Sequence, residues 1–187
     1  MAEIRDWKHA RAKWVGVLEK RTGVSLAAWN ARVKKEAPST RTGVTAWLSE
    51  QGVEGYGRTI LLMERFGYPE WLTAGAGELV DAQYEGKPDL RKVYDRVIKA
   101  VSRFKGVAVQ TRKTYISLVT PRRTFARVQA GKDHVKIALR LEGRRPGGRL
   151  QRSRVHDEMP VEMAIENVKQ VDAEAIALLR EAYEESL

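Results

Sequence analysis

The chain contains no cysteine, which excludes disulfide bonds, zinc–thiolate sites and thiol catalysis. A chain without cysteine fits a reducing compartment, and we expect a cytoplasmic protein. The sequence also lacks any run that approaches the roughly 18 consecutive apolar residues of a membrane helix. Residues 1–14 are charged throughout, whereas a secretory signal has an apolar segment. We therefore expect no membrane partner.

Recognisable catalytic and cofactor-binding patterns are also missing. The sequence has no Gly-x-Ser-x-Gly nucleophile elbow, no phosphate-binding P-loop and no dinucleotide-binding glycine pattern. Its three histidines, His9, His134 and His156, do not stand at ligand spacing from one another. His156 precedes Asp157 and Glu158, a cluster that suits either a cation or, as we favour, a solvated acidic loop. We therefore expect no enzyme activity, no catalytic residue, no cofactor and no metal site.

What the sequence does contain is an uneven distribution of charge. The net charge of the 187-residue chain is +10 at pH 7. Residues 84–156 hold 20 Lys and Arg against 5 Asp and Glu, residues 1–83 hold 12 against 10, and residues 157–187 hold 2 against 9. A strongly basic segment before an acidic tail is typical of a polyanion-binding surface. A hydrophobic content of 43% is enough for a buried core, in one domain or two small ones.

The first 72 residues predict a small helical bundle. Trp7 and Leu18 share one face of a first helix that ends near Gly23, and Ser25 is placed to cap a second helix. A third helix starts near residue 40 and a fourth carries residues 60–66, whereas the Gly-Tyr-Gly-Arg sequence at 55–58 indicates a turn. Tryptophans anchor these helices, either as core residues, which we favour, or as a stacking platform for bases or a peptide: Trp14, Trp29, Trp47 and Trp71.

Residues 73–83 include Ala-Gly-Ala-Gly, which predicts a linker, so that a second domain spans residues 84–187. This domain opens with an amphipathic helix that is N-capped by Asp89 and whose apolar stripe ends at Phe104. The fold class is therefore α+β, with an N-terminal helical bundle and a C-terminal antiparallel β-meander of three to four strands flanked by helices. Alternating residues predict strands over 111–119, 124–129, 134–141 and 161–165, and Asp172 caps a last helix.

The predicted strands have two different faces, because side chains alternate along a strand. One face is apolar and is expected to pack on the helix that begins at Asp89. On the other face cations interleave with aromatic rings, a combination that binds single-stranded nucleic acid because cations contact phosphates and rings stack on bases. The candidate nucleic-acid-binding residues are Lys113, Tyr115, Phe125, Arg127, Lys136 and Arg140 on this face, Arg122 and Arg123 at a hairpin tip, and Arg144, Arg145 and Arg149 in a loop over residues 143–154.

Several interpretations of the basic residues stand beside one another. Half-exposed strands commonly carry Lys, Arg and Tyr because one face is wet, and the acidic helix over 172–187 is able to cover Arg127, Lys136 and Arg140. A structural surface is therefore weighed against one that binds DNA or RNA, our leading hypothesis, or another anionic partner. Two further hypotheses are a protein-interaction module that docks through the tryptophan-rich domain or the basic loop, and a small anionic ligand between the two domains.

Two sets of motifs resemble known families that together cover most of the chain. The residues at 19–23, 46–48 and 55–58 are similar to DUF4287, a small bacterial helical family of unknown function. Many of its members have a His-Ala pair after Gly-x-Gly-Arg, where this chain has Thr59 and Ile60, so no role of that histidine carries over. The C-terminal part resembles a second family of unknown function, DUF5655, at residues 84–87, 93–95, 112–116 and 125–128.

The two resemblances imply little about activity. Relatives of the second family have been labelled predicted transport proteins, a label that suits poorly a chain without a membrane segment. Its pattern of a helix followed by a meander also looks like a double-wing fold that is associated with DNA-binding proteins. That likeness is an analogy between folds, and a fold does not by itself specify a function.

Overall fold

A computed structural model describes the backbone of residues 3–5 and 7–187, with side chains for residues 8–70 and 72–187. The chain divides into two compact units. One ends at Ala74, and the other joins β1 (Glu3–Arg5) to the chain from Gly75 to Leu187. Each unit has a hydrophobic core of its own.

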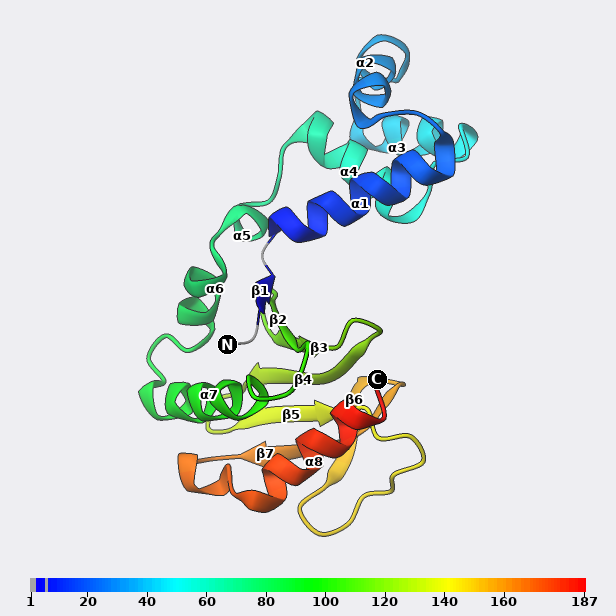
Figure 1. The fold of residues 1–187 in the computed structure, drawn as a ribbon. Coiled ribbons are helices and arrows are strands. Elements are labelled where there is room, and N and C mark those ends of the chain that lie inside the picture. Colours follow the sequence, from blue (N-terminus) through cyan, green and yellow to red (C-terminus); the bar gives the residue numbers. More distant parts are fainter. Residues whose placement is uncertain (1–2, 6) are drawn as a thin grey trace. The chain divides into compact units, whose positions relative to one another are not determined.

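The N-terminal unit is built from helices, as the spacing of its apolar residues predicts. Ser25 and Thr40 each cap a helix, because their hydroxyl oxygens accept a hydrogen bond from the backbone N–H three residues further on. Residues 55–58, which we expected to form a turn, instead begin a helix. A Cβ atom at the buried Gly57 would lie 3.2 Å from Leu18, so this glycine permits a close helix contact. The helices are α1 (Trp7–Thr22), α2 (Leu26–Glu36), α3 (Arg41–Glu50), α4 (Gly55–Phe66) and α5 (Glu70–Thr73) (Figure 1).

Tryptophan side chains help to fill the core of this unit. Trp29 is 3% exposed, and its indole N–H donates a hydrogen bond to the hydroxyl of Thr22 over 2.9 Å. Trp47 meets Trp29 edge to face, with ring centroids 6.4 Å apart. The side chains of Trp7 and Trp71, which we also placed in this bundle, lie outside the described residues.

A polar cluster joins three helices of the N-terminal unit. Glu64 in α4 accepts hydrogen bonds from Arg11 in α1 over 2.7 Å, from Asn30 in α2 over 3.3 Å, and from the hydroxyl of Tyr68. Burial acts to raise the pKa of Glu64, but the hydrogen bonds from Tyr68 and Arg11 outweigh it and lower the pKa. The carboxylate is therefore charged and fully partnered, which makes the cluster a brace between helices.

The C-terminal unit is a sheet with helices packed on it. In the described residues the sheet has seven strands in the order β1-β2-β3-β4-β5-β7-β6, and only β1 and β2 run parallel. The α+β class is confirmed, and so is the antiparallel meander, which runs from β2 to β5. The strands after β1 are β2 (Ala108–Thr111), β3 (Ile116–Val119), β4 (Thr124–Ala130), β5 (Val135–Leu139), β6 (Gln151–His156) and β7 (Met159–Ile165), and the helices are α6 (Ala76–Gln83), α7 (Pro88–Val101), the 3-10 helix η1 (Val168–Gln170) and α8 (Ala173–Glu184).

Several strands differ from the sequence prediction. The strand expected over 111–119 is shorter: its second half is β3, whereas Thr111 ends β2, and the chain reverses between them where the N–H of Arg112 donates to the carbonyl of Tyr115 over 2.9 Å. The end of the expected basic loop forms β6, which pairs with β7. Residues 3–5, which we assigned to the helical domain, form β1 and extend the C-terminal sheet. Strand β7 matches the expected fourth strand but lies between β5 and β6.

The start of the C-terminal unit also differs from the prediction. Helix α6 fills most of the expected linker, and the side chain of Glu78 in its first turn accepts a hydrogen bond from the N–H of Gly75. Helix α7 is capped at Lys87 and not at Asp89, because Pro88, which has no N–H to satisfy, occupies the first helical position. Asp89 lies inside that first turn.

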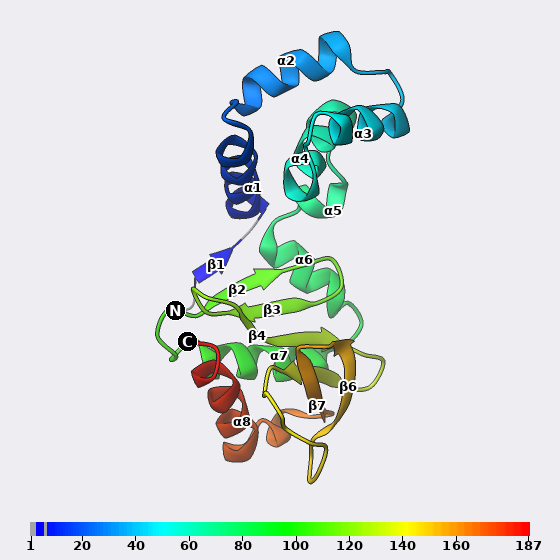
Figure 2. The same ribbon diagram turned by 90° about the vertical axis from the view of Figure 1, so that its right-hand side faces the viewer.

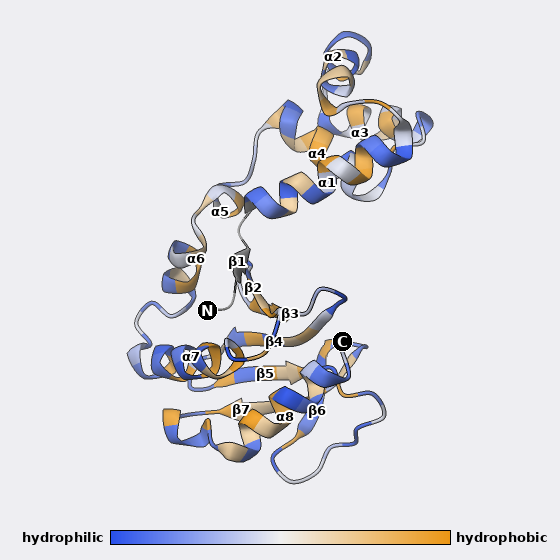
Figure 3. Cartoon of the chain, in the orientation of Figure 1, coloured by the Kyte–Doolittle hydropathy of each residue, from blue (hydrophilic) through white to orange (hydrophobic). Residues whose placement is uncertain are grey.

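Helices α7 and α8 pack on the same face of the sheet, as both views show (Figures 1 and 2). Val97 of α7 and Leu179 of α8 are fully buried in one core with Ile137 and Leu139 of β5. Burial of each such side chain stabilises the fold by about 1.5–3 kcal/mol. Hydrophobic and hydrophilic residues interleave along both helices (Figure 3), as expected for helices with one buried face.

Candidate nucleic-acid interface

The acidic helix lies on the apolar face of the sheet. Helix α8 packs beside α7 against β4 and β5, and Tyr183 of α8 contacts the rings of Phe104 and Phe125. The interpretation in which this helix covers the basic face and pairs with Arg127, Lys136 and Arg140 is therefore wrong. The apolar stripe of α8 decides its position, because that stripe must be buried against the apolar side of the strands.

Phe125 lies in the core and not on the basic face. Its side chain is fully buried, and its ring centroid is 5.8 Å from that of Tyr183. The cause is a β-bulge, in which β4 has one extra residue opposite the step from Leu118 to Val119 in β3. The bulge shifts the alternation of side chains in β4, so Phe125 is not available to stack on a base.

Tyr115 and Arg127 meet on the basic face. The guanidinium carbon of Arg127 lies 3.5 Å from the centroid of the Tyr115 ring. This cation–π contact holds the guanidinium in one orientation. The Nε atom of Arg127 is buried and has no hydrogen-bond partner among the described residues. A buried donor without a partner favours an acceptor from a water molecule or a ligand.

These two side chains line a half-open pocket of about 160 Å³. Ser117, on the strand next to Arg127, also lines it, is only 8% exposed and makes no hydrogen bond from its hydroxyl among the described residues. The turn between β6 and β7 supplies another wall. The remaining lining residues are Thr124, Arg140, His156, Glu158 and Met159.

Arg140 is held from two sides in this pocket. Its Nε donates to the carbonyl of Thr124 over 2.8 Å, and its Nη2 forms an ion pair with the carboxylate of Glu158. The Nδ1 of His156 accepts a hydrogen bond from the N–H of Glu158 over 3.2 Å. The hydrogen bond and the charge of Arg140 lower the pKa of Glu158, so this carboxylate is ionised at neutral pH. A phosphate that binds the Nη2 of Arg140 therefore competes with Glu158.

The basic loop is paired with the acidic helix. Arg144 forms an ion pair with Glu181, and Arg149 forms one with Asp172 at 2.7 Å. Arg149 also donates to the carbonyl of Gln170 over 2.8 Å. Asp172 and Glu181 thus offset the charge of the loop, whereas Glu158 is the acidic residue that pairs with the sheet face, at Arg140. Within the described residues the exposed Arg145 has no partner.

The tip of the β3–β4 hairpin is tied to the end of α8. Arg123 donates from Nη2 to the carbonyl of Glu185, and the hydroxyl of Thr120 donates to the carbonyl of Ser186 over 2.8 Å. Arg122 is exposed, and its side chain has no partner among the described residues. Of the two arginines expected to reach out from this tip, only Arg122 is free to do so.

Other cations on the sheet also have no carboxylate partner in the described part of the chain. Lys113 is exposed in the turn before β3, and Lys136 is half-buried in β5. Arg152 and Arg154 are exposed on the edge strand β6 and were absent from the prediction. Their alternation around Ser153 is a strand signal, but the Gly and Pro residues just before it favoured a loop.

Sequence reasoning found part of the pocket and missed the rest. It placed Tyr115, Arg127 and Arg140 on one surface, and all three line the pocket. It interpreted His156 and Glu158 as part of a solvated acidic loop. The strand order, with β7 between β5 and β6, brings the end of β6, which holds His156, and the following turn, which holds Glu158, to the pocket.

Two other kinds of feature are absent from the described residues. Within the described residues no group of three or more His, Asp or Glu side chains is arranged to hold a metal ion. None of the helices in that part of the chain is both long and apolar enough to cross a membrane.

The model of a family described as a domain of unknown function, DUF5655, matches residues 80–186. The chain belongs to the DUF5655 family. The matched region contains the basic pocket and both helices that cover the apolar face. It leaves out most of the helical unit, whose resemblance to DUF4287 stays a prediction. Searches against the curated proteins and against the solved structures gave no match.

Proposed function

We propose that this DUF5655 protein binds single-stranded nucleic acid through the basic face of its C-terminal sheet and catalyses no reaction. One observation carries the proposal: Arg127 lies stacked on Tyr115 in a pocket on the side of the sheet opposite α7 and α8. A guanidinium over a ring presents a phosphate-binding group beside an aromatic surface on which a base is able to stack.

The cations around the pocket support the proposal. Lys113 and Lys136 have no carboxylate partner among the described residues, so their charges are available to phosphates. Each phosphate that a lysine or arginine neutralises releases counterions, and the affinity then falls as salt rises. Together with Arg127 in β4, these charges lie on two strands and one turn, a spacing that suits an extended backbone.

The aromatic group favours single strands over duplexes. Tyr115 is half-buried at the wall of a pocket, and only an unstacked base reaches such a ring. Bases of a duplex are stacked on one another, whereas those of a single strand are free to stack on protein side chains.

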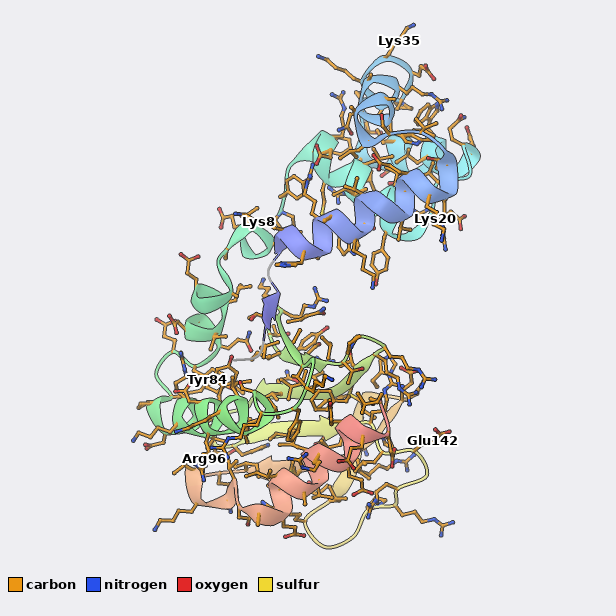
Figure 4. The ribbon with its side chains drawn as sticks, viewed as in Figure 1. Lys8, Lys20, Lys35, Tyr84, Arg96 and Glu142 are labelled. Atoms are coloured by element: carbon orange, nitrogen blue, oxygen red, sulfur yellow. The ribbon has the colours of Figure 1, made fainter. Side chains whose placement is uncertain are left out.

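Fluorescence anisotropy with labelled oligonucleotides tests the proposal. Single-stranded DNA and RNA and a duplex of the same sequence are titrated at low salt and then over a salt series. We expect single strands to bind more tightly, with the logarithm of the binding constant falling linearly with the logarithm of salt concentration. The proposal is wrong if neither single nor double strands bind at low salt. Arg96→Gln is a matched control, because Arg96 is exposed on α7, which packs on the opposite face (Figure 4).

A second candidate function, protein docking through the helical unit, has one observation in its favour. Tyr56 is 55% exposed, and its ring stacks on Trp14 with centroids 4.9 Å apart. An exposed ring held in place by another ring is typical of an anchor in a protein interface. A pull-down that retains one stoichiometric protein after nuclease treatment, and loses it in Tyr56→Ala, would favour this candidate.

A further inference from the structure

The pocket beside Tyr115 contains more positive than negative charge. Arg127 and Arg140 both line it, and Glu158 is its acidic residue. The charge of Arg123 also lowers the pKa of Glu158, which places a third guanidinium near this carboxylate. The pocket therefore keeps a positive charge while Glu158 is ionised, and it favours an anion.

Two hydrogen-bond donors in the pocket lack partners among the described residues. The Nε of Arg127 is buried without an acceptor, and the hydroxyl of Ser117, a residue that is 8% exposed, makes no hydrogen bond in the described part of the chain. Buried polar groups in native proteins are nearly always hydrogen-bonded. An anion with several oxygen atoms would supply acceptors to both donors and to Arg140 at once.

We propose that this pocket is a phosphomonoester site, in which the carboxylate of Glu158 occupies the place that a phosphate takes on Arg140. The charge of the ligand decides between phosphate classes. A phosphodiester carries one negative charge and gains little by replacing a carboxylate that also carries one. A phosphomonoester carries about 1.5–2 negative charges at pH 7, so it displaces Glu158 from Arg140 more readily.

The source of the phosphomonoester is the end of a nucleic-acid strand, an assignment that rests on the proposed function. Tyr115 forms one wall of the pocket, beside the place where the phosphate binds. The terminal base is then close enough to stack on the tyrosine, and the following phosphates lie along the unpaired cations of the sheet. A free phosphate has the same headgroup chemistry without these additional contacts.

Paired oligonucleotides that differ only at one end test this inference. A single strand with a 5′-phosphate, the same strand with a 5′-hydroxyl, and a strand with a 3′-phosphate are titrated by anisotropy with the label at the other end. Thymidine monophosphate and inorganic phosphate compete in separate arms. We expect a phosphorylated strand to bind several-fold more tightly than its hydroxyl counterpart, and the mononucleotide to compete better than inorganic phosphate.

Variants of the pocket sharpen the test. Glu158→Gln removes the competing charge and is expected to raise the affinity for a phosphorylated end several-fold. Arg127→Leu is expected to lower it about tenfold or more, since a hydrogen bond to a charged group is lost. Arg127→Lys keeps the charge but loses the planar fork of the guanidinium. It replaces Arg127→Leu if the leucine variant has a lower melting temperature than the unmodified protein. Arg96→Gln, with its matched loss of charge on α7, is expected to leave the preference unchanged.

Each outcome decides at least one of the two proposals. Equal binding of phosphorylated and hydroxyl strands, with no effect of Glu158→Gln, overturns the phosphomonoester site and leaves nucleic-acid binding in place. Binding of the mononucleotide or of inorganic phosphate without binding of any strand supports the site and overturns the proposed function. If no strand and no phosphate compound binds, both proposals are wrong.

Discussion

The arginines on the sheet face and those in the loop before β6 carry the same charge but differ in what holds them. Arg144 and Arg149 in the loop are paired with carboxylates of the C-terminal segment. Arg127 on the sheet stacks on a tyrosine and has no carboxylate partner among the described residues. The loop is richer in arginine and glycine, yet the acidic helix offsets most of its charge.

This difference shows that the position of a charged helix follows its apolar side. Leu179 and Tyr183 place α8 on the apolar face of the sheet. The glutamates of α8 then pair with the segment that borders the exposed side of this helix. That segment is the loop that follows Glu142 (Figure 4). The basic sheet face keeps its charge because the helix is bound elsewhere by the hydrophobic effect, which contributes far more than exposed ion pairs.

The largest expected effect distinguishes Phe125 from Tyr115, the two aromatic residues that the sequence prediction placed together on the basic face. Phe125→Ala is expected to reduce the free energy of unfolding by about 3–5 kcal/mol, because it leaves a cavity beside Tyr183. Chemical denaturation followed by circular dichroism measures this change. Loss of oligonucleotide binding in Phe125→Ala with unchanged stability would contradict the core position of this ring.

Tyr115→Ala is expected to have the opposite profile. The ring is half-buried at the surface, so stability changes little, whereas the affinity for single strands falls by about 1–3 kcal/mol through lost stacking. Isothermal titration calorimetry on the folded variant provides the affinity, and a thermal melt provides the control. An unchanged affinity would show that the ring contacts only Arg127.

How much of this interface the sequence predicts depends on how local its determinants are. The amphipathic stripe of α7, the meander and the pair formed by Tyr115 and Arg127 follow from local periodicity. Phe125 was misplaced because a single extra residue in β4 reverses the alternation, and no residue type marks such a bulge. Glu158 was missed because its contact with Arg140 depends on the order of strands far apart in sequence.

A smaller effect on stability is expected when a charge at the start of the acidic helix α8 is removed. The pKa of Asp172 is lowered by the hydrogen bond that its carboxylate accepts from the N–H of Ala175, and by the ion pair with Arg149. A carboxyl whose pKa is lowered by folding stabilises the native state above its unfolded pKa, and this contribution disappears as the pH falls through the folded pKa. Asp172→Asn keeps a capping oxygen but loses the charge. We expect its melting temperature to lie below that of the unmodified protein at pH 7 and to converge with it below about pH 4.

The pH series has its own control. Glu174→Gln, in the first turn of the same helix, removes a charge that lies at 3.5 Å from Arg149. We expect a smaller difference in melting temperature for this variant at pH 7. Equal differences for the two variants at every pH would show that the capping position has no special role.

The most direct test of the central claim compares two double variants that each remove two positive charges. Arg127→Ala with Lys136→Ala changes the sheet face, and Arg144→Ala with Arg149→Ala changes the loop. The affinity for one single-stranded oligonucleotide is measured over a salt series for both. We predict that the sheet variant loses affinity and that its salt slope falls by about 2, whereas the loop variant keeps the slope of the unmodified protein. An equal or larger loss in the loop variant would contradict the account.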